Sequence, residues 1–353
     1  MKRVQLRRVF IFLFLTFLLS WGFDWLVYQL YPTEMKAITG VHPWGMLAPA
    51  FVAILLQMFF FSDSRIYFRN YRAKPRWIFL SFLIVTILYG LLIVLACNSP
   101  SIRKIFQGIS ALLYTLWTLF VISIFGQAKK ENPDALADAG LQMGNTEIAP
   151  RFILGIVLFL LLQAVLNLVF GLGDLAARQE LIYGLPLPPV LYIPALVLLF
   201  LPVTVIGIPL SGLAGVFGEE YGWRGFLQSQ LTCIGKWQGV ITVGFIWGLW
   251  HLPIILRGTH TYPPTVLGIL LALLFFMLWG VVQGYAVLKT GSIWLAAFMH
   301  GVVNSVYAFT LQYIARPDDK LFSFGLGIFG ILLLAIIVAF IFRDPVWKKS
   351  EAG

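Results

Sequence analysis

The sequence contains few charged residues and few cysteines. Only 11% of its 353 residues are Asp, Glu, Lys or Arg, whereas about a quarter are charged in a typical soluble domain. A water-soluble globule could not bury the apolar surface of a chain that is 60% hydrophobic, so a soluble enzyme is excluded. The two cysteines, Cys97 and Cys233, cannot build a disulfide framework, and we expect free thiols.

Long apolar runs dominate the chain instead, and its mean hydropathy is +0.89. A helix needs roughly 20 apolar residues to cross a hydrocarbon core of about 30 Å. Ten runs approach that length: 9–30, 46–61, 77–97, 106–126, 152–172, 190–212, 238–256, 265–288, 291–313 and 321–342. The alternating strands that a membrane barrel requires are absent from the sequence. We therefore predict an all-α, polytopic transmembrane bundle of about ten helices.

The net charge of +10 is explained by membrane topology. If the N-terminus lies inside and the ten runs alternate in direction, 18 of the 25 Lys and Arg residues fall inside and seven outside. This bias favours an inside location for both termini, and residues 9–30 then read as an uncleaved signal anchor. The expected partners are membrane lipid and a membrane-associated peptide or protein, and no nucleic acid.

Two segments complicate this topology. Residues 190–232 contain several prolines and an amphipathic stretch, GEEYGWRGFLQSQL, which can re-enter the bilayer. If that stretch spans the bilayer fully, the count becomes eleven and the sidedness of the later helices reverses. The polar segment 126–150 is expected to be a loop, with a solvated turn at 132–134.

Ionisable residues at membrane depth are costly, so the few that occur are functional candidates. Glu219, Glu220 and Arg224 form the first group. On a helix, Glu220 and Arg224 share a face and can pair, whereas Glu219 points about 100° away. We therefore assign a supporting role to the Glu220–Arg224 pair and the role of general base to Glu219.

The second and third groups are His251, and His300 with Asn304. If the chain turns near Gly235, Glu219 and His251 each lie 16 positions from the turn and should face each other at similar depth. Asn304 is one helical turn beyond His300 on the same face. The four groups can therefore converge in one intramembrane pocket.

Such a pocket suits hydrolysis. Glu219 with a histidine can activate water, while His300 and Asn304 can donate hydrogen bonds to an oxyanion. Glu219, His251 and His300 also match a catalytic zinc ligand set, so zinc is a candidate cofactor. The sequence lacks H-E-x-x-H, which would have indicated zinc strongly, and no cofactor is assigned.

The arrangement E-E-x-x-x-R, aromatic-x-x-x-H and H-x-x-x-N, each on its own helix, resembles the CPBP family of CAAX proteases and bacteriocin-processing (Abi) enzymes. By this resemblance Glu219 is the catalytic glutamate, His251 belongs to the second motif, and His300 with Asn304 forms the third. The family usually has Phe where this sequence has Trp247. The resemblance implies a CAAX-type intramembrane endopeptidase, glutamate- or metal-dependent, acting on a membrane-associated or lipidated protein.

The resemblance also divides the chain. Residues 1–189 would supply about five N-terminal membrane helices, residues 190–312 the CPBP/Abi-like catalytic core, and residues 313–353 a final helix with a short basic tail. The architecture and the lack of a retention signal favour a bacterial plasma membrane.

Other functions remain open from the sequence. The chain can be a catalytically silent bacteriocin-immunity protein or membrane scaffold, or a carrier that uses Gln163, Asn167 and Gln283, which we interpret as helix-packing contacts. Gly171 to Asp174 resembles the GxGD element of aspartyl intramembrane proteases, but the only other membrane aspartate is Asp24. We expect Asp174 to act as a helix cap.

Overall fold

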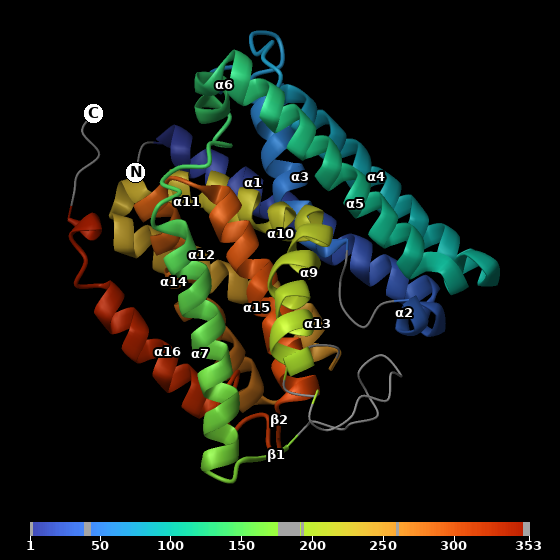
Figure 1. Ribbon diagram of the computed structural model, residues 1–353. Helices are drawn as coiled ribbons and strands as arrows, with labels where there is room; N and C mark the ends of the chain where they lie inside the picture. Colours follow the sequence, from blue (N-terminus) through green and yellow to red (C-terminus); the bar gives the residue numbers. More distant parts are fainter. Residues whose placement is uncertain (1–2, 39–43, 176–190, 192–193, 259–260, 349–353) are drawn as a thin grey trace. The chain divides into compact units, whose positions relative to one another are not determined.

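The computed structural model describes residues 3–38, 44–175, 191, 194–258 and 261–348. These residues form helices joined by short connections, with one two-stranded ribbon (Figure 1). The prediction of an all-α helical bundle is confirmed.

Seven helical segments are long and apolar enough to cross a membrane: α1 (Arg3–Leu30), α4 (Arg76–Asn98), α5 (Pro100–Glu131), α7 (Ala149–Val169), α12 (Lys236–Trp250) with α13 (Leu252–Leu256), α14 (Val266–Thr290) and α15 (Ile293–Tyr313). Leu196–Ser211 and Leu213–Ile234 pass the same test only as a pair, which is interrupted at Gly212. Gly45–Phe60 and Ile328–Ile341 are shorter apolar helices. The chain is therefore an integral, multi-pass membrane protein, and helices are found in all ten predicted runs.

The other elements are short. They are α2 (Pro32–Ile38), η1 (Gly45–Leu47), α3 (Ala48–Leu55), η2 (Leu56–Phe60), α6 (Pro133–Asp138), β1 (Gly173–Leu175), η4 (Leu196–Phe200), η5 (Val203–Gly207), α9 (Ile208–Ser211), α10 (Leu213–Glu220), η6 (Tyr221–Leu227), α11 (Gln228–Leu231), η7 (Thr232–Ile234), β2 (Ala315–Pro317), α16 (Ile328–Ile341) and η8 (Pro345–Trp347). Four of them, η2, η4, η5 and η6, are wide π-helical turns.

The chain divides into two compact units. The first unit comprises Met1–Asn145, Ser211–Val243 and Gly284–Ala297, and the second comprises Thr146–Leu210, Gly244–Gln283 and Phe298–Gly353. Each unit is built from segments far apart in the sequence.

In the first unit, α4 and α5 form an antiparallel hairpin. Ser99 caps α5 by accepting a hydrogen bond from the backbone N–H of Ile102, and Pro100 occupies the first turn, where no N–H is needed. The core of this unit is aromatic. The ring of Phe217 lies 5.1–5.3 Å from four other rings, those of Phe82, Trp117, Tyr221 and Trp294.

Residues 132–134 are exposed, as predicted, but the polar segment after α5 is not a plain loop, so that part of the prediction is wrong. Asn132 caps α6 by accepting from the N–H of Ala135, and Leu141 is fully buried. The indole of Trp294 donates to the carbonyl of Leu141 at 2.7 Å, and the N–H of Asn145 donates to the carbonyl of Thr290 at 2.8 Å. Residues 132–145, which we call the clasp, therefore dock on the turn between α14 and α15.

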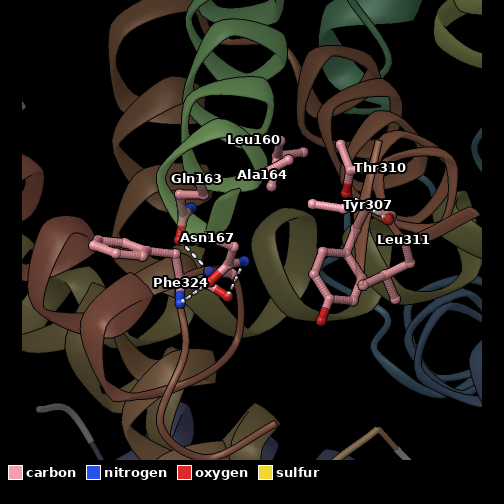
Figure 2. A pocket seen from close by; sticks show the side chains of 10 residues that line it. Leu160, Gln163, Ala164, Asn167, Tyr307, Thr310, Leu311 and Phe324 are labelled. Atoms are coloured by element: carbon pink, nitrogen blue, oxygen red, sulfur yellow. Dashed lines mark hydrogen bonds between the residues drawn. The ribbon is translucent and has the colours of Figure 1, made fainter. Parts of the chain in front are cut away.

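In the second unit, the amides of α7 hold the segment between β2 and α16. Asn167 Oδ1 accepts from the N–H of Phe324 at 2.9 Å, and Gln163 Oε1 accepts from the N–H of Gly325 at 2.6 Å. Figure 2 shows these contacts beside a cavity of about 10 Å³, bounded across from α7 by Tyr307 and Thr310. Gln163 and Asn167 thus pack the structure, although their partner is a loop backbone and not another helix.

Asp174 lies in β1, opposite Arg316 of β2. The expected helix cap is therefore wrong, because α7 has already ended at Val169 and the chain has become extended at this position.

Candidate functional site

The glutamate motif lies where α10 runs into the π turn η6, in the first unit. Here Gly218 and Gly222 permit close packing on the backbone of η1 and α3. A Cβ on Gly218 would lie 2.3 Å from the carbonyl oxygen of Met46, and one on Gly222 would lie 2.5 Å from the carbonyl carbon of Pro49. Glycines four residues apart allow membrane helices to approach this closely. The G-E-E-Y-G sequence is therefore fixed by its two glycines, with both glutamates between them.

Glu220 and Arg224 form the predicted ion pair. Arg224 Nη1 donates to Glu220 Oε1 at 3.0 Å, and both side chains are fully buried. The pair bridges α10 and η6, and such π turns occur frequently at functional sites. If one partner of a buried pair is lost, the other charge is left unpaired in a low dielectric, which is costly. The contact therefore holds the end of α10 to η6.

Glu219 is also buried, with a relative exposure of 2%. It is the penultimate residue of α10, and it lies one position from the ion pair. The first unit therefore holds two adjacent buried carboxylates, of which Glu220 faces the guanidinium of Arg224.

His251 follows α12 in the second unit and begins α13, because Pro253 prevents continuation of the longer helix. Its Nδ1 lies 2.8 Å from the carbonyl oxygen of Trp247. A carbonyl can only accept, so Nδ1 carries the proton and Nε2 holds the lone pair when the ring is neutral. The ring is stacked on Phe276, with centroids 3.8 Å apart and planes 12° apart.

Trp247 contacts both candidate histidines, His251 and His300. Its ring centroid is 5.4 Å from that of His251 and 5.5 Å from that of His300, both in edge contacts. The two imidazoles come from helices about 50 positions apart in the sequence, and the indole is almost completely buried. The aromatic residue of the second motif thus contacts both histidines.

Close helix packing again sets this geometry. A Cβ on Gly244 would lie 2.7 Å from the carbonyl oxygen of Met277, and one on Gly248 would lie 3.3 Å from Phe276 Cβ. The second glycine pair therefore brings α12 against α14, which places the Phe276 ring on His251.

The third motif lies on α15. His300 is buried, and Asn304 is exposed although its neighbours at 303 and 305 are buried. Gly301 allows contact with Pro209, and Ser305 donates to the carbonyl oxygen of Thr204 at 2.8 Å. In a π turn, the carbonyl of Thr204 would accept a hydrogen bond from the N–H five residues later. That residue is Pro209, which has no N–H, so the hydroxyl of Ser305 supplies the hydrogen bond instead.

The structure thus brings His251 and His300 together in the second unit, and Glu219, Glu220 and Arg224 together in the first. The convergence of these two groups stays a prediction. The described residues contain no group of three His, Cys, Asp or Glu side chains that could hold a metal ion. His251 has the orientation of a metal ligand, with its second nitrogen held by a carbonyl. The candidate zinc ligands Glu219, His251 and His300 fall in different units, so that ligand set also stays a prediction, and we derive no step through a metal.

Two features of the site were missed at the sequence level: the contact of Trp247 with both histidines and the glycine pairs that pack the motif helices. The glycine pairs can be recognised in the sequence, because G-E-E-Y-G and G-F-I-W-G each carry glycines four residues apart. The contact of Trp247 with both histidines has no sequence signal beyond the aromatic character of the residue.

Comparison with known proteins finds one family. Residues 192–306 match the model described as type II CAAX prenyl endopeptidase, Rce1-like. The comparisons with curated proteins and with solved structures find no match. The matched range includes all six candidate residues, and it supports a CAAX-protease-like intramembrane endopeptidase in general terms. The region from residue 192 to 306 is thus similar to the Rce1-like CAAX endopeptidases, which confirms the resemblance to the CPBP family.

Proposed function

We propose that this protein hydrolyses a peptide bond of a membrane-associated or lipidated protein, with Glu219 and His251 activating water and His300 with Asn304 binding the oxyanion. The observation that carries the proposal is the contact of both histidines with one buried indole, inside the region that matches the endopeptidase family. Two imidazoles from different helices then share one location in a site of low dielectric.

The tautomer of His251 supports its role as a base. Because Nδ1–H is directed at the carbonyl of Trp247, Nε2 is the nitrogen that can accept a proton from water. The stacked Phe276 ring limits rotation of the imidazole, which keeps that nitrogen in one direction.

The proposed reaction needs one base, one acid and an oxyanion site. Glu219, aided by His251, removes a proton from water, and the resulting hydroxide attacks the peptide carbonyl carbon. His300 and Asn304 donate hydrogen bonds to the oxygen that becomes negative. The proton then passes to the leaving nitrogen, and the C–N bond breaks. The exposed carboxamide of Asn304 is accessible to a substrate carbonyl.

The test is cleavage of membrane-anchored and lipidated peptides by the purified protein in lipid. We expect Glu219→Gln to lower the rate by at least about a hundredfold, since general base catalysis contributes about 10²–10⁴. Glu131→Gln, at an exposed carboxylate, is the matched control and should retain full activity. Equal rates for Glu219→Gln and the wild type would contradict the assignment. Absence of cutting by a folded wild type would contradict the function.

A further inference from the structure

A basic surface lies at one end of the first unit, outside the candidate site. It consists of the connection between η2 and α4, residues 61–75, and the neighbouring segment 127–138 at the end of α5 and in α6 (Figure 1). Four contacts join the two segments. Lys74 Nζ donates to Glu131 Oε1 at 2.6 Å and to Gln127 Oε1 at 2.8 Å. Tyr71 donates to the carbonyl of Ala135 at 2.7 Å, and Arg65 lies 3.5 Å from Asp138.

The acidic residues of this surface are already engaged. Asp63 pairs with Arg8, Glu131 with Lys74, and Asp138 with Arg65. Hydrogen bonding to Arg8 lowers the pKa of Asp63, so this carboxylate stays charged and occupied. Asp134 lies in the first turn of α6, where a negative charge stabilises the helix N-terminus.

Four cations remain. Arg69, Arg72, Lys129 and Lys130 are exposed, and among the described residues none has an acidic partner at ion-pair distance. We call them the basic patch. Topology alone would place positive charges on this side of the membrane, but it would not require that they be left without counter-charges while their neighbours are paired.

Aromatic side chains lie in and beside the same segment as the patch. Phe60 is 68% exposed at the end of η2, and Trp77 is 46% exposed at the start of α4. The guanidinium of Arg72 lies 5.9 Å from the ring centroid of Phe68, and that of Arg76 lies 4.8 Å from that of Trp77. Because α4 and α5 are membrane-spanning helices, their paired ends lie where headgroups are found.

We propose that the basic patch binds the phosphate groups of anionic phospholipids in the adjoining leaflet. Clusters of Lys and Arg next to a membrane helix attract anionic headgroups, and each charge contributes separately. The fit is to a lipid and not to a soluble phosphate, because the exposed aromatic rings place the cations at the membrane surface. This site is independent of the peptidase function.

The test is the apparent Kd of the full-length protein for phosphatidylglycerol in mixed micelles at low salt, measured beside phosphatidylcholine and soluble glycerol phosphate. The test variant is Arg69→Gln, Arg72→Gln, Lys129→Gln and Lys130→Gln. The control variant removes the same charge from exposed positions elsewhere, through Lys104→Gln, Arg316→Gln, Lys320→Gln and Arg343→Gln. The thermal unfolding midpoint of each variant without added lipid confirms folding.

We expect the patch variant to bind phosphatidylglycerol at least about a hundredfold more weakly, with the control close to wild type. Phosphatidylcholine and glycerol phosphate should bind weakly to all three proteins. Equal affinity of the patch and control variants would overturn the proposal, as would equal binding of the two lipids. Glycerol phosphate binding as tightly as the lipid would show a soluble phosphate site instead.

Discussion

The Glu220–Arg224 pair shows how much a single contact can matter in this chain. Both side chains are fully buried, and the pair joins α10 to a π turn next to Glu219. A buried ion pair adds little net stability over an apolar pair, but loss of one partner is expensive. The pair therefore fixes the geometry around Glu219 more than it stabilises the fold.

We expect Arg224→Met to lower the free energy of unfolding by about 3–5 kcal/mol, because it leaves Glu220 charged and buried. Adding Glu220→Gln should recover at least half of that loss. Denaturant unfolding in detergent measures both values. The exposed Arg65–Asp138 pair provides the control, since Arg65→Met should cost about 1 kcal/mol or less. Equal losses for Arg224→Met and Arg65→Met would refute this account.

At the scale of elements, the motif helices are positioned by backbone contacts. Gly218 and Gly222 hold α10 and η6 on Met46 and Pro49, and Gly244 holds α12 on Met277. These contacts leave no room for a methyl group, whereas Gly215, on the same helix as Gly218, would place its Cβ 3.5 Å from the flexible end of Met46. The two positions therefore differ in packing and share a helix.

Gly218→Ala should destabilise the protein by about 1–3 kcal/mol and reduce peptidase activity, since the Cβ would overlap the Met46 carbonyl. Gly215→Ala should leave stability unchanged or slightly raised, because alanine favours the helix. Thermal unfolding and cleavage rates of the two variants give the comparison. Similar behaviour of both would mean that close packing does not position α10.

The clasp offers a second matched pair of glycines. Gly140 and Gly144 both have φ near +65°, but a Cβ on Gly140 meets open space, whereas one on Gly144 would lie 1.9 Å from the Thr290 carbonyl oxygen. Both alanine variants carry the backbone cost, and only Gly144→Ala displaces the clasp. We expect trypsin to cut faster after Lys129 or Lys130 in Gly144→Ala, with Gly140→Ala close to wild type. Equal cleavage would show that the clasp is not held at Thr290.

For the whole molecule, the exposed apolar side chains mark the lipid contact. On α5 they include Ile105, Leu112, Leu116, Leu119 and Ile122, each more than half exposed. Single exposed apolar residues are ordinary, but rows of them on spanning helices show a surface that hydrocarbon covers. The membrane is therefore part of the solvent for this fold.

The two cysteines can be used to test the orientation of the protein in the membrane. Cys233 is exposed next to the turn at Gly235, and Cys97 is buried near the end of α4. The predicted topology places Cys233 inside, so an impermeant maleimide should label it in inverted vesicles and not in right-side-out vesicles. Cys233→Ala should abolish this labelling. Labelling only in right-side-out vesicles would reverse the sidedness.

Much of the fold could be predicted because apolar runs and membrane thickness together fix the spans. The polar segment after α5 was misjudged, since the burial of Leu141 depends on a tertiary contact with Trp294. The π turns were not predicted, because an extra residue in a helical turn has no residue-type signature. The candidate residues were chosen for their cost in a membrane, but the contact of Trp247 with both histidines required the structure.

The glycine contacts also bear on how heat loosens the molecule. A contact between two backbones contains no rotamer that can change, so α10 cannot move against Met46, nor α12 against Met277, unless the contact itself separates. The exposed leucines and isoleucines of α5 can change rotamer without breaking any helix contact. We therefore expect warming to mobilise these lipid-facing side chains while Glu219, which lies between Gly218 and Gly222, keeps its local geometry.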